Sequence, residues 1–226
     1  MKRIIFILLL AAAGISMQAQ THYVPHVWVG GHAGVTLSEM SFTPSVRQSM
    51  VQGMTFGASF RFAEERHVGL IAELNVSQRG WKEDFEGAPF SYRRKLTYIE
   101  LPVLTHIFFG SRKFKGFFNL GPVVGYMVGD NISSDFDYAN PGSVSGFPLA
   151  NRSTEQMSMD IKNKFDYGIT AGAGCEFVVK RRHSFMLEAR YYFGLGNIFP
   201  SKKKDTFSAS RGTSILITLG YMFRLK

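Results

Sequence analysis

The stretch that decides the fold is residues 165–179, which read FDYGITAGAGCEFVV. Apolar residues alternate with polar or small ones along its whole length. One face would carry Phe165, Tyr167, Ile169, Ala171, Ala173, Cys175, Phe177 and Val179, and the other Asp166, Gly168, Thr170, Gly172, Gly174 and Glu176. A period of two is that of a β-strand, because successive side chains point to opposite faces. A strand of about ten residues can cross a membrane, so this stretch is long enough.

Seven further segments alternate in the same way, so the sequence predicts eight strands. The other seven lie near residues 28–37, 54–62, 70–77, 99–107, 118–126, 185–196 and 214–224. Their connections are short at 63–66, 110–113 and 180–183, and long at 39–52, 79–94, 129–162 and 198–211. Short turns at one end and long loops at the other are typical of outer-membrane barrels. We therefore predict an all-β, eight-stranded antiparallel transmembrane up-and-down β-barrel with short periplasmic turns and long extracellular loops, the longest of them mobile.

The N-terminal residues have the pattern of a secretory signal peptide. Lys2 and Arg3 precede an apolar run at 4–13, which is too short for a membrane helix. We predict a signal peptide at 1–19 and one outer-membrane β-barrel domain at 20–226. Cys175 is the only cysteine, so the chain can form no internal disulfide. The net charge of +9 comes mostly from turns and loops and matches no nucleic-acid motif, so we place these charges near anionic lipid headgroups.

The face opposite the apolar one would carry seven formal charges inside the barrel. They are Arg61, Glu73, Glu100, Glu176, Glu188, Arg190 and Arg224. Burying an unpaired charge costs several kcal/mol, so these groups must pair. We predict an ion-paired plug that locks the barrel. The alternative is a proton or ion path through Glu100 and His106. Inward glycines would make room for large neighbours such as Arg190 and Tyr192.

Two prolines depart from the ideal strand pattern. Pro102 and Pro122 lack the N–H that a ladder needs, so we expect a bulge or a local ladder break at each.

Aromatic residues gather at both ends of the outward face, as interfacial girdles do. The girdle on the long-loop side would contain Tyr98, Tyr126, Phe165 and Tyr167.

Catalytic and metal sites find little support in the sequence. His183 and Ser184 fall on a predicted periplasmic turn, whereas outer-membrane enzymes place such groups near the outer rim. Asp130, Asp135 and Asp137 could supply oxygens to Ca²⁺, but they lack the spacing of a calcium loop. We therefore predict a solvated acidic loop, no catalytic residue, no metal and no cofactor.

Several short motifs carry a resemblance to a known family. These are Tyr98-Ile99-Glu100-Leu101-Pro102-Val103-Leu104, Asn119-Leu120-Gly121-Pro122, Gly172-Ala173-Gly174-Cys175-Glu176 and Arg190-Tyr191-Tyr192. The chain resembles, over residues 22–226, the PorT-like family of outer-membrane β-barrels common in Bacteroidetes. The motifs are structural, so the resemblance implies the fold and no catalytic residue. The name-giving member acts in type IX secretion and gliding, which would make secretion-machinery proteins partners.

The function that the sequence predicts is that of an integral outer-membrane protein, non-enzymatic and monomeric, with a structural or interaction role through its extracellular loops. The expected partners are outer-membrane lipid and lipopolysaccharide, and the barrel-assembly machinery during insertion, but no nucleic acid. Three alternatives remain: an accessory of the type IX secretion machinery, a small passive porin-like channel, and a soluble lipocalin-like binder. The last would need large apolar residues inside in place of Glu, Arg and Gly.

Overall fold

The computed structural model describes residues 26–63, 67–149, 152–202 and 205–225. The expected signal peptide at 1–19 therefore lies outside the described residues. No helix among the described residues is long and apolar enough to cross a membrane.

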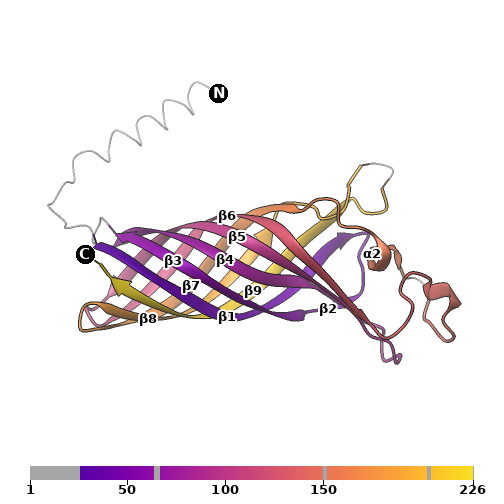
Figure 1. The fold of residues 1–226 in the computed structure, drawn as a ribbon, viewed down its shortest axis with the longest axis horizontal. Helices are drawn as coiled ribbons and strands as arrows, with labels where there is room; N and C mark the ends of the chain where they lie inside the picture. The colour runs from indigo at the N-terminus through magenta and orange to yellow at the C-terminus, as the bar shows by residue number, and fades with distance from the viewer. Residues whose placement is uncertain (1–25, 64–66, 150–151, 203–204, 226) are drawn as a thin grey trace, which may run out of the picture.

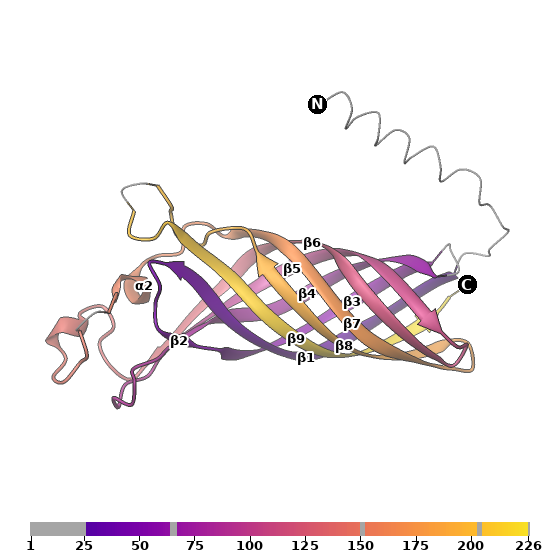
Figure 2. The same ribbon diagram turned by 180° about the vertical axis from the view of Figure 1, so that it is seen from behind.

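Eight long antiparallel strands close into a barrel. They are β1 (His26–Thr43), β3 (Val51–Ala63), β4 (Val68–Glu83), β5 (Tyr92–Gly110), β6 (Phe114–Ser134), β7 (Phe165–Val179), β8 (His183–Gly194) and β9 (Ala209–Arg224). The ring closes because β1 pairs with β9 and β4 pairs with β5. Figures 1 and 2 show the first and last strands side by side in the wall. The predicted eight-stranded up-and-down barrel is confirmed.

Three small elements sit at one end of the barrel. A two-residue strand, β2 (Gln48–Ser49), pairs with the end of β4. A 3-10 turn, η2 (Pro141–Ser143), and a short helix, α2 (Glu155–Ser158), lie in the connection between β6 and β7. All three belong to the long-loop end, opposite the short turns and the C-terminus (Figure 1).

Side chains alternate between the two faces as the sequence predicts. In β7, for example, Ile169 is 49% exposed on the outside, whereas Thr170 is 2% exposed inside. Apolar side chains are exposed on the outside of the long strands, including Val35, Phe56, Leu74, Leu101, Leu120, Ile169, Leu187 and Leu219. We call the part of the barrel that carries this outer apolar surface the belt section.

The predicted position of Tyr98 in the outward aromatic girdle is wrong. Its side chain is only 2% exposed and points inward, while its neighbour Ile99 is 44% exposed. The two residues must face opposite sides, and a register shift between Thr97 and Tyr98 in the pairing of β5 with β6 precedes them. Tyr126, Phe165 and Tyr167 do face outward.

The strands extend beyond the predicted ends into all four predicted loops. β1 continues to Thr43, β4 continues to Glu83, and β6 continues to Ser134 before the loops begin. Here the paired strands extend beyond the last outward apolar residues, because backbone hydrogen bonds between strands do not require lipid on the outside. We call this extension, together with the loops that fill it, the long-loop section. The predicted loops at 39–52, 79–94, 129–162 and 198–211 were therefore too wide.

The two strand prolines interrupt the ladder locally without changing its register. Between β4 and β5, bridge pairs stop at Ala72↔Val103 and resume at Asn75↔Glu100, which leaves out Pro102. Between β5 and β6, they stop at Pro102↔Val123 and resume at Thr105↔Leu120, which leaves out Pro122. The predicted local break at each proline is confirmed.

Candidate functional site

The interior of the belt section holds a chain of paired polar groups, which begins near the short-turn end. Arg61 Nη2 on β3 donates a 2.7 Å hydrogen bond to Glu176 Oε1 on β7. Ser184 Oγ on β8 donates to the same oxygen at 2.5 Å. Arg61 Nη1 also lies 3.4 Å from His106 Nε2 on β5. Four strands are therefore tied across the barrel at this level.

Arg190 on β8 is the centre of the next cluster. Its guanidinium donates to both oxygens of Glu73 on β4, at 2.8 and 3.0 Å, and to both oxygens of Glu188, at 3.0 and 2.8 Å. Asn119 joins this cluster to the one below. Its Nδ2 donates to Glu188 Oε1 at 2.8 Å, and its Oδ1 lies 2.7 Å from His106 Nδ1.

A third cluster surrounds Arg79 on β4. Arg79 Nη2 lies 2.6 Å from Glu100 Oε1 and 3.1 Å from Asp166 Oδ2. The guanidinium carbon also lies 4.4 Å from the centre of the Tyr98 ring and 4.2 Å from that of Tyr192. Tyr192 donates its hydroxyl hydrogen to Asp166 Oδ2 at 2.9 Å. A single cation thus serves two carboxylates between two aromatic faces, an arrangement that favours a desolvated guanidinium.

The structure brings six of the seven predicted interior charges into these clusters. Glu73, Glu188 and Arg190 meet one another, Arg61 meets Glu176, and Glu100 meets Arg79. Arg224 lies apart at the short-turn end, where its Nη2 is 2.8 Å from His26 Nδ1.

Sequence reasoning did not include Arg79 or Asp166 in the interior network. Arg79 was assigned to a loop, although the alternation through 71, 73, 75 and 77 continues to it and could have placed it inside. Asp166 was placed on the inward face of its strand, but its partner was unknown while Arg79 was thought to lie outside. The two groups of the alternative proton path, Glu100 and His106, belong to different clusters with different partners.

Glycines on the inward face leave the space that these side chains occupy. A Cβ atom on Gly172 would lie 2.7 Å from Glu188 Oε1, and one on Gly168 would lie 2.7 Å from the ring of Tyr192. Two voids between the interior side chains have volumes of about 20 and 10 Å³. A void of that size holds one water molecule or none.

A larger cavity of about 570 Å³ opens beside the lowest cluster, at the short-turn end. Its walls include Trp28, Phe108 and Lys115, and Arg61 lies over the Trp28 ring at 4.7 Å. Glu176 is the acidic residue of this lining and is already held by Arg61 and Ser184. The cavity ends at the plug.

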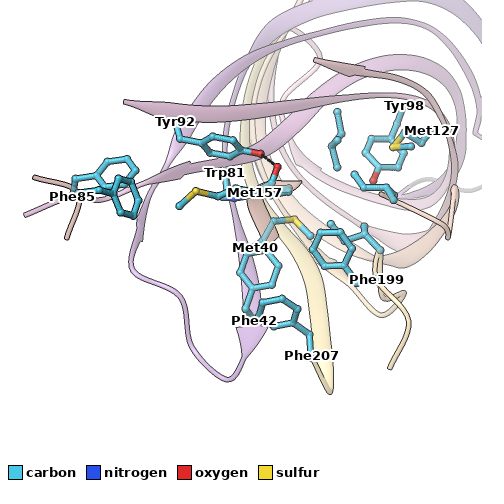
Figure 3. Packing of buried hydrophobic residues seen from close by; sticks show 14 residues of the cluster. Met40, Phe42, Trp81, Phe85, Tyr92, Tyr98, Met127, Met157, Phe199 and Phe207 are labelled. Carbon is cyan, nitrogen blue, oxygen red and sulfur yellow. Dashed lines mark hydrogen bonds between the residues drawn. The ribbon is translucent and has the colours of Figure 1, made fainter. Parts of the chain in front are cut away.

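The interior of the long-loop section is mostly apolar instead. A cluster of buried side chains fills it, and we call this cluster the cap core. It consists of Met40, Phe42, Trp81, Phe85, Tyr92, Leu96, Tyr98, Met127, Phe147, Met157, Ile161, Ile198, Phe199 and Phe207. Figure 3 shows Phe42, Phe199 and Phe207 gathered on one side and Tyr92 over Met157 on the other. The predicted loops covered all of these residues except Leu96, Tyr98 and Met127, so this core was not predicted. Members such as Met40, Phe42, Trp81 and Leu96 continue the inward alternation of their strands, whereas Phe147, Met157 and Phe207 lie in the connections between strands and follow no period.

The connection between β6 and β7 enters the barrel mouth through α2. Met157 has no exposed surface, and its carbonyl oxygen accepts a 2.7 Å hydrogen bond from the Tyr92 hydroxyl (Figure 3). Arg94 Nη1 donates to the carbonyl oxygen of Met159 at 2.7 Å, and Arg94 Nη2 lies 2.6 Å from Asp130 Oδ2. The part of the longest loop around α2 is thus packed into the mouth.

One carboxyl group is buried beneath α2. Glu83, at the end of β4, accepts hydrogen bonds from Trp81 Nε1 at 3.2 Å and Gln156 Nε2 at 3.0 Å. Arg152 Nη1 lies 3.5 Å from its other oxygen. Burial nevertheless raises the pKa of Glu83 to about 7, since it outweighs these hydrogen bonds and the nearby guanidinium.

The groups considered for metal binding and catalysis do not form sites. Asp130 pairs with Arg94, Asp135 accepts from the Ser91 N–H, and Asp137 accepts from the Ala139 N–H. Within the described ranges, no group of three or more metal-binding side chains occurs. His183 and Ser184 have separate partners, with His183 Nδ1 2.8 Å from the Tyr221 hydroxyl on the outer face.

Comparison with known proteins agrees with this geometry. The family described as "Outer membrane protein beta-barrel domain" matches residues 18–200. The outer membrane protein OprG from Pseudomonas aeruginosa is similar over 90% of this chain and 97% of its own, with a TM-score of 0.55 and 10% identity. At that identity the likeness shows the fold alone. No curated protein sequence matches the chain.

Two other solved structures match with lower scores. The attachment invasion locus protein Ail of Yersinia pestis, in complex with the heparin analogue sucrose octasulfate, is 12% identical over 87% of this chain and 99% of its own, with a TM-score of 0.41. The outer membrane enzyme PagL is 13% identical over 88% and 99%, with a TM-score of 0.36. The closed ring of strands, the outer apolar belt and the family match lead to one conclusion: the chain belongs to the outer membrane protein β-barrel domain family and is a protein of the outer membrane.

Proposed function

We propose that this protein is a closed, non-enzymatic outer-membrane barrel that holds a fixed extracellular surface for interaction with other molecules. The observation that carries the proposal is the cap core, which packs strand ends and loops into one body above the membrane. Long loops on a barrel are ordinarily free to move. Here the connection between β6 and β7 is held at Met157 and Met159 by Tyr92 and Arg94, so the part of it around α2 has a defined position.

The polar plug supports a role other than conduction. Three ion-paired clusters follow one another along the interior, and the two voids described beside them each hold a single water molecule at most. Eight-stranded barrels have an interior that side chains can just fill. We therefore expect no stable open conductance from the purified protein in planar bilayers at neutral pH. Large, steady single-channel currents, blocked by a bulky residue at Gly172, would favour the porin-like channel instead.

The absence of an enzyme activity is part of the same proposal. In the described part of the chain, His183 and Ser184 contact different partners, and the buried carboxylates inside the barrel are ion-paired. A general base must reach the proton that it removes, which groups locked in the plug cannot do.

The interaction role is tested by photo-cross-linking in intact cells. A photoreactive residue would replace Leu149, which is 49% exposed in the longest loop. The matched control would carry it at Arg112, an exposed residue in a short periplasmic turn. We expect a discrete cross-linked product from position 149 that is absent from position 112. Equal labelling at both positions, or none at 149 under any growth condition, would contradict the role proposed for the loops.

An accessory role in type IX secretion is the second candidate, and the resemblance of the Tyr98–Leu104 motif to the PorT-like family of Bacteroidetes favours it. Its test is a deletion strain. A loss of secreted type IX substrates that the wild-type gene restores would support this role, and unchanged secretion would exclude it. The partners proposed in either case are outer-membrane lipid and lipopolysaccharide, with the barrel-assembly machinery acting during insertion.

A further inference from the structure

We propose that Lys82, Arg93 and Lys95 form a site on the outer wall of the barrel that binds the phosphate groups of a glycolipid in the outer leaflet. This inference rests on the proposed lipid and lipopolysaccharide partners, and it deepens that proposal by naming the residues on the wall below the loops and the chemical group that they bind.

Strand register places the three cations together. Lys82 on β4 pairs directly with Arg93 on β5, and Lys95 lies two residues further along the same face of β5, beside Gly80. Directly opposed residues have Cβ atoms about 5 Å apart, and residues two apart on a strand are separated by roughly 7 Å. Lys82 and Arg93 are exposed, and Lys95 is partly exposed, on the outside of the wall. Three positive groups therefore converge on an area that one or two phosphate groups could cover.

This cluster has no acidic partner of its own. Among the described residues, none of the three cations forms an ion pair, whereas the neighbouring inward residue Arg94 is paired with Asp130. Like charges directly across a ladder destabilise a sheet. An anion between Lys82 and Arg93 would remove that repulsion and form charge-assisted hydrogen bonds, which guanidinium groups make bidentately with phosphate.

The height of the cluster fits lipid headgroups. Ile99, which is 44% exposed, marks the top of the belt section on β5, and Lys95 and Arg93 lie four and six residues before it in the chain, toward the long-loop end. On the tilted strand of a barrel, that distance leads from the hydrocarbon into the headgroup layer. The outward positions directly opposite the three cations supply hydrogen-bonding groups: Ser49 opposes Lys82, Asn131 opposes Lys95, and Ser133 opposes Arg93. Two exposed acids, Asp84 and Asp135, lie two residues beyond Lys82 and Ser133 toward the loops, and they accept hydrogen bonds from the backbone N–H groups of Glu86 and Ser91.

The opposite wall provides a comparison within the same molecule. Arg211 on β9 lies four residues above lipid-facing Ile215, as Lys95 lies four above Ile99. Next to it, however, β1 carries Glu39, which pairs with Thr213 two residues away. Positive and negative groups therefore share that wall, and Arg211 is a matched control at an equivalent place on its strand.

The test measures binding of a fluorescent lipid A with two phosphates to the full-length mature protein in zwitterionic detergent. The variant K82Q/R93Q/K95Q removes the cations and keeps polar side chains of similar length, and R211Q is the control. Each cation near an anionic surface contributes roughly fivefold to binding, so the triple variant should bind on the order of 100-fold more weakly. R211Q should bind within about twofold of the wild type, and unheated samples of both variants should keep the fast gel mobility of a folded barrel.

Two further ligands separate a lipid from a free anion. Dephosphorylated lipid A should bind to wild type and triple variant alike, and weakly. Inorganic phosphate should compete with lipid A only at concentrations far above that of the lipid. The proposal is overturned if the triple variant keeps wild-type affinity, if R211Q loses as much, if the dephosphorylated lipid binds equally well, or if inorganic phosphate alone binds as tightly as the lipid.

Discussion

The two sections of this barrel have opposite interiors. In the belt section, buried Arg190 is held by Glu73 and Glu188 under an outer surface of exposed apolar side chains. In the long-loop section, Trp81, Phe199 and Met157 fill the interior with no exposed surface at all. The same strands run through both, so the difference does not come from the backbone.

The medium outside the wall accounts for the difference. Where lipid covers the outside, apolar side chains are stable there, and the interior can be polar provided that every charge is paired. Where water covers the outside, burial of apolar side chains inside becomes the main stabilising contribution, as in a soluble protein. The belt section is thus built like a membrane protein and the long-loop section like a soluble domain, and the two meet near Arg79 and Tyr98.

The largest effect is expected from Arg190→Ala. The substitution leaves Glu73 and Glu188 buried without their cation, which should lower the free energy of unfolding by about 3–5 kcal/mol. Chemical denaturation in detergent micelles or bilayers, followed by tryptophan fluorescence, measures the change. Leu187→Ala, on the lipid face of the same strand, is the control with little expected loss. Wild-type stability in R190A would mean that the plug does not hold the belt section together.

Met157→Ala tests the interior of the long-loop section. Removing a fully buried methionine side chain should cost about 2–5 kcal/mol, but the loss should fall on the long-loop section. We expect faster proteolysis of the connection between β6 and β7, while the barrel keeps its fast mobility on unheated gels. If instead the whole barrel loses stability with no local opening, the two sections unfold together and the comparison fails.

Leu187→Arg tests the outer surface of the belt section. A charged side chain facing lipid near the membrane midplane should cost about 2–4 kcal/mol, and less near the headgroups. Lys82→Leu, in the long-loop section, is the complementary change and should leave folding stability nearly unaffected. Refolding titrations into lipid vesicles measure both. Equal effects at the two positions would place the membrane boundary elsewhere.

The titration of Glu83 tests the long-loop section through its pH dependence. Since burial raises its folded-state pKa to about 7 from 4.5, the protonated form is the one that the folded long-loop section favours. Its contribution is fully present below pH 4.5 and is lost as the pH rises through 7, by at most roughly 1.4 kcal/mol per pH unit.

Trp81 reports this titration, because its Nε1 donates a hydrogen bond to Glu83. In a Trp28→Phe background, we expect the fluorescence of Trp81 to change with a midpoint near pH 7. Glu83→Gln keeps the hydrogen bond and should abolish the change. A midpoint near 4.5 would show that water reaches the carboxyl group.

The sequence by itself determined the belt section. Alternation through segments such as 165–179 was enough for strand number, for the direction of nearly every side chain, and for the presence of interior charges. This works because lipid outside and a narrow interior impose a strict period of two, which a single strand records without its neighbours. Tyr98 was misplaced only where it was assigned against the alternation of its own strand.

Only the tertiary structure decided the rest. Which carboxylate meets which guanidinium depends on the register of strands far apart in the chain, as between Arg61 and Glu176 or Arg190 and Glu73. The cap core depends on it even more, because Met40, Trp81, Met157 and Phe207 come from four separate regions, and the last two lie in connections between strands, without alternation. Which side chains contact one another inside a closed barrel depends on the strands across the ring and on the loops above them. The order of residues along one strand does not contain that information.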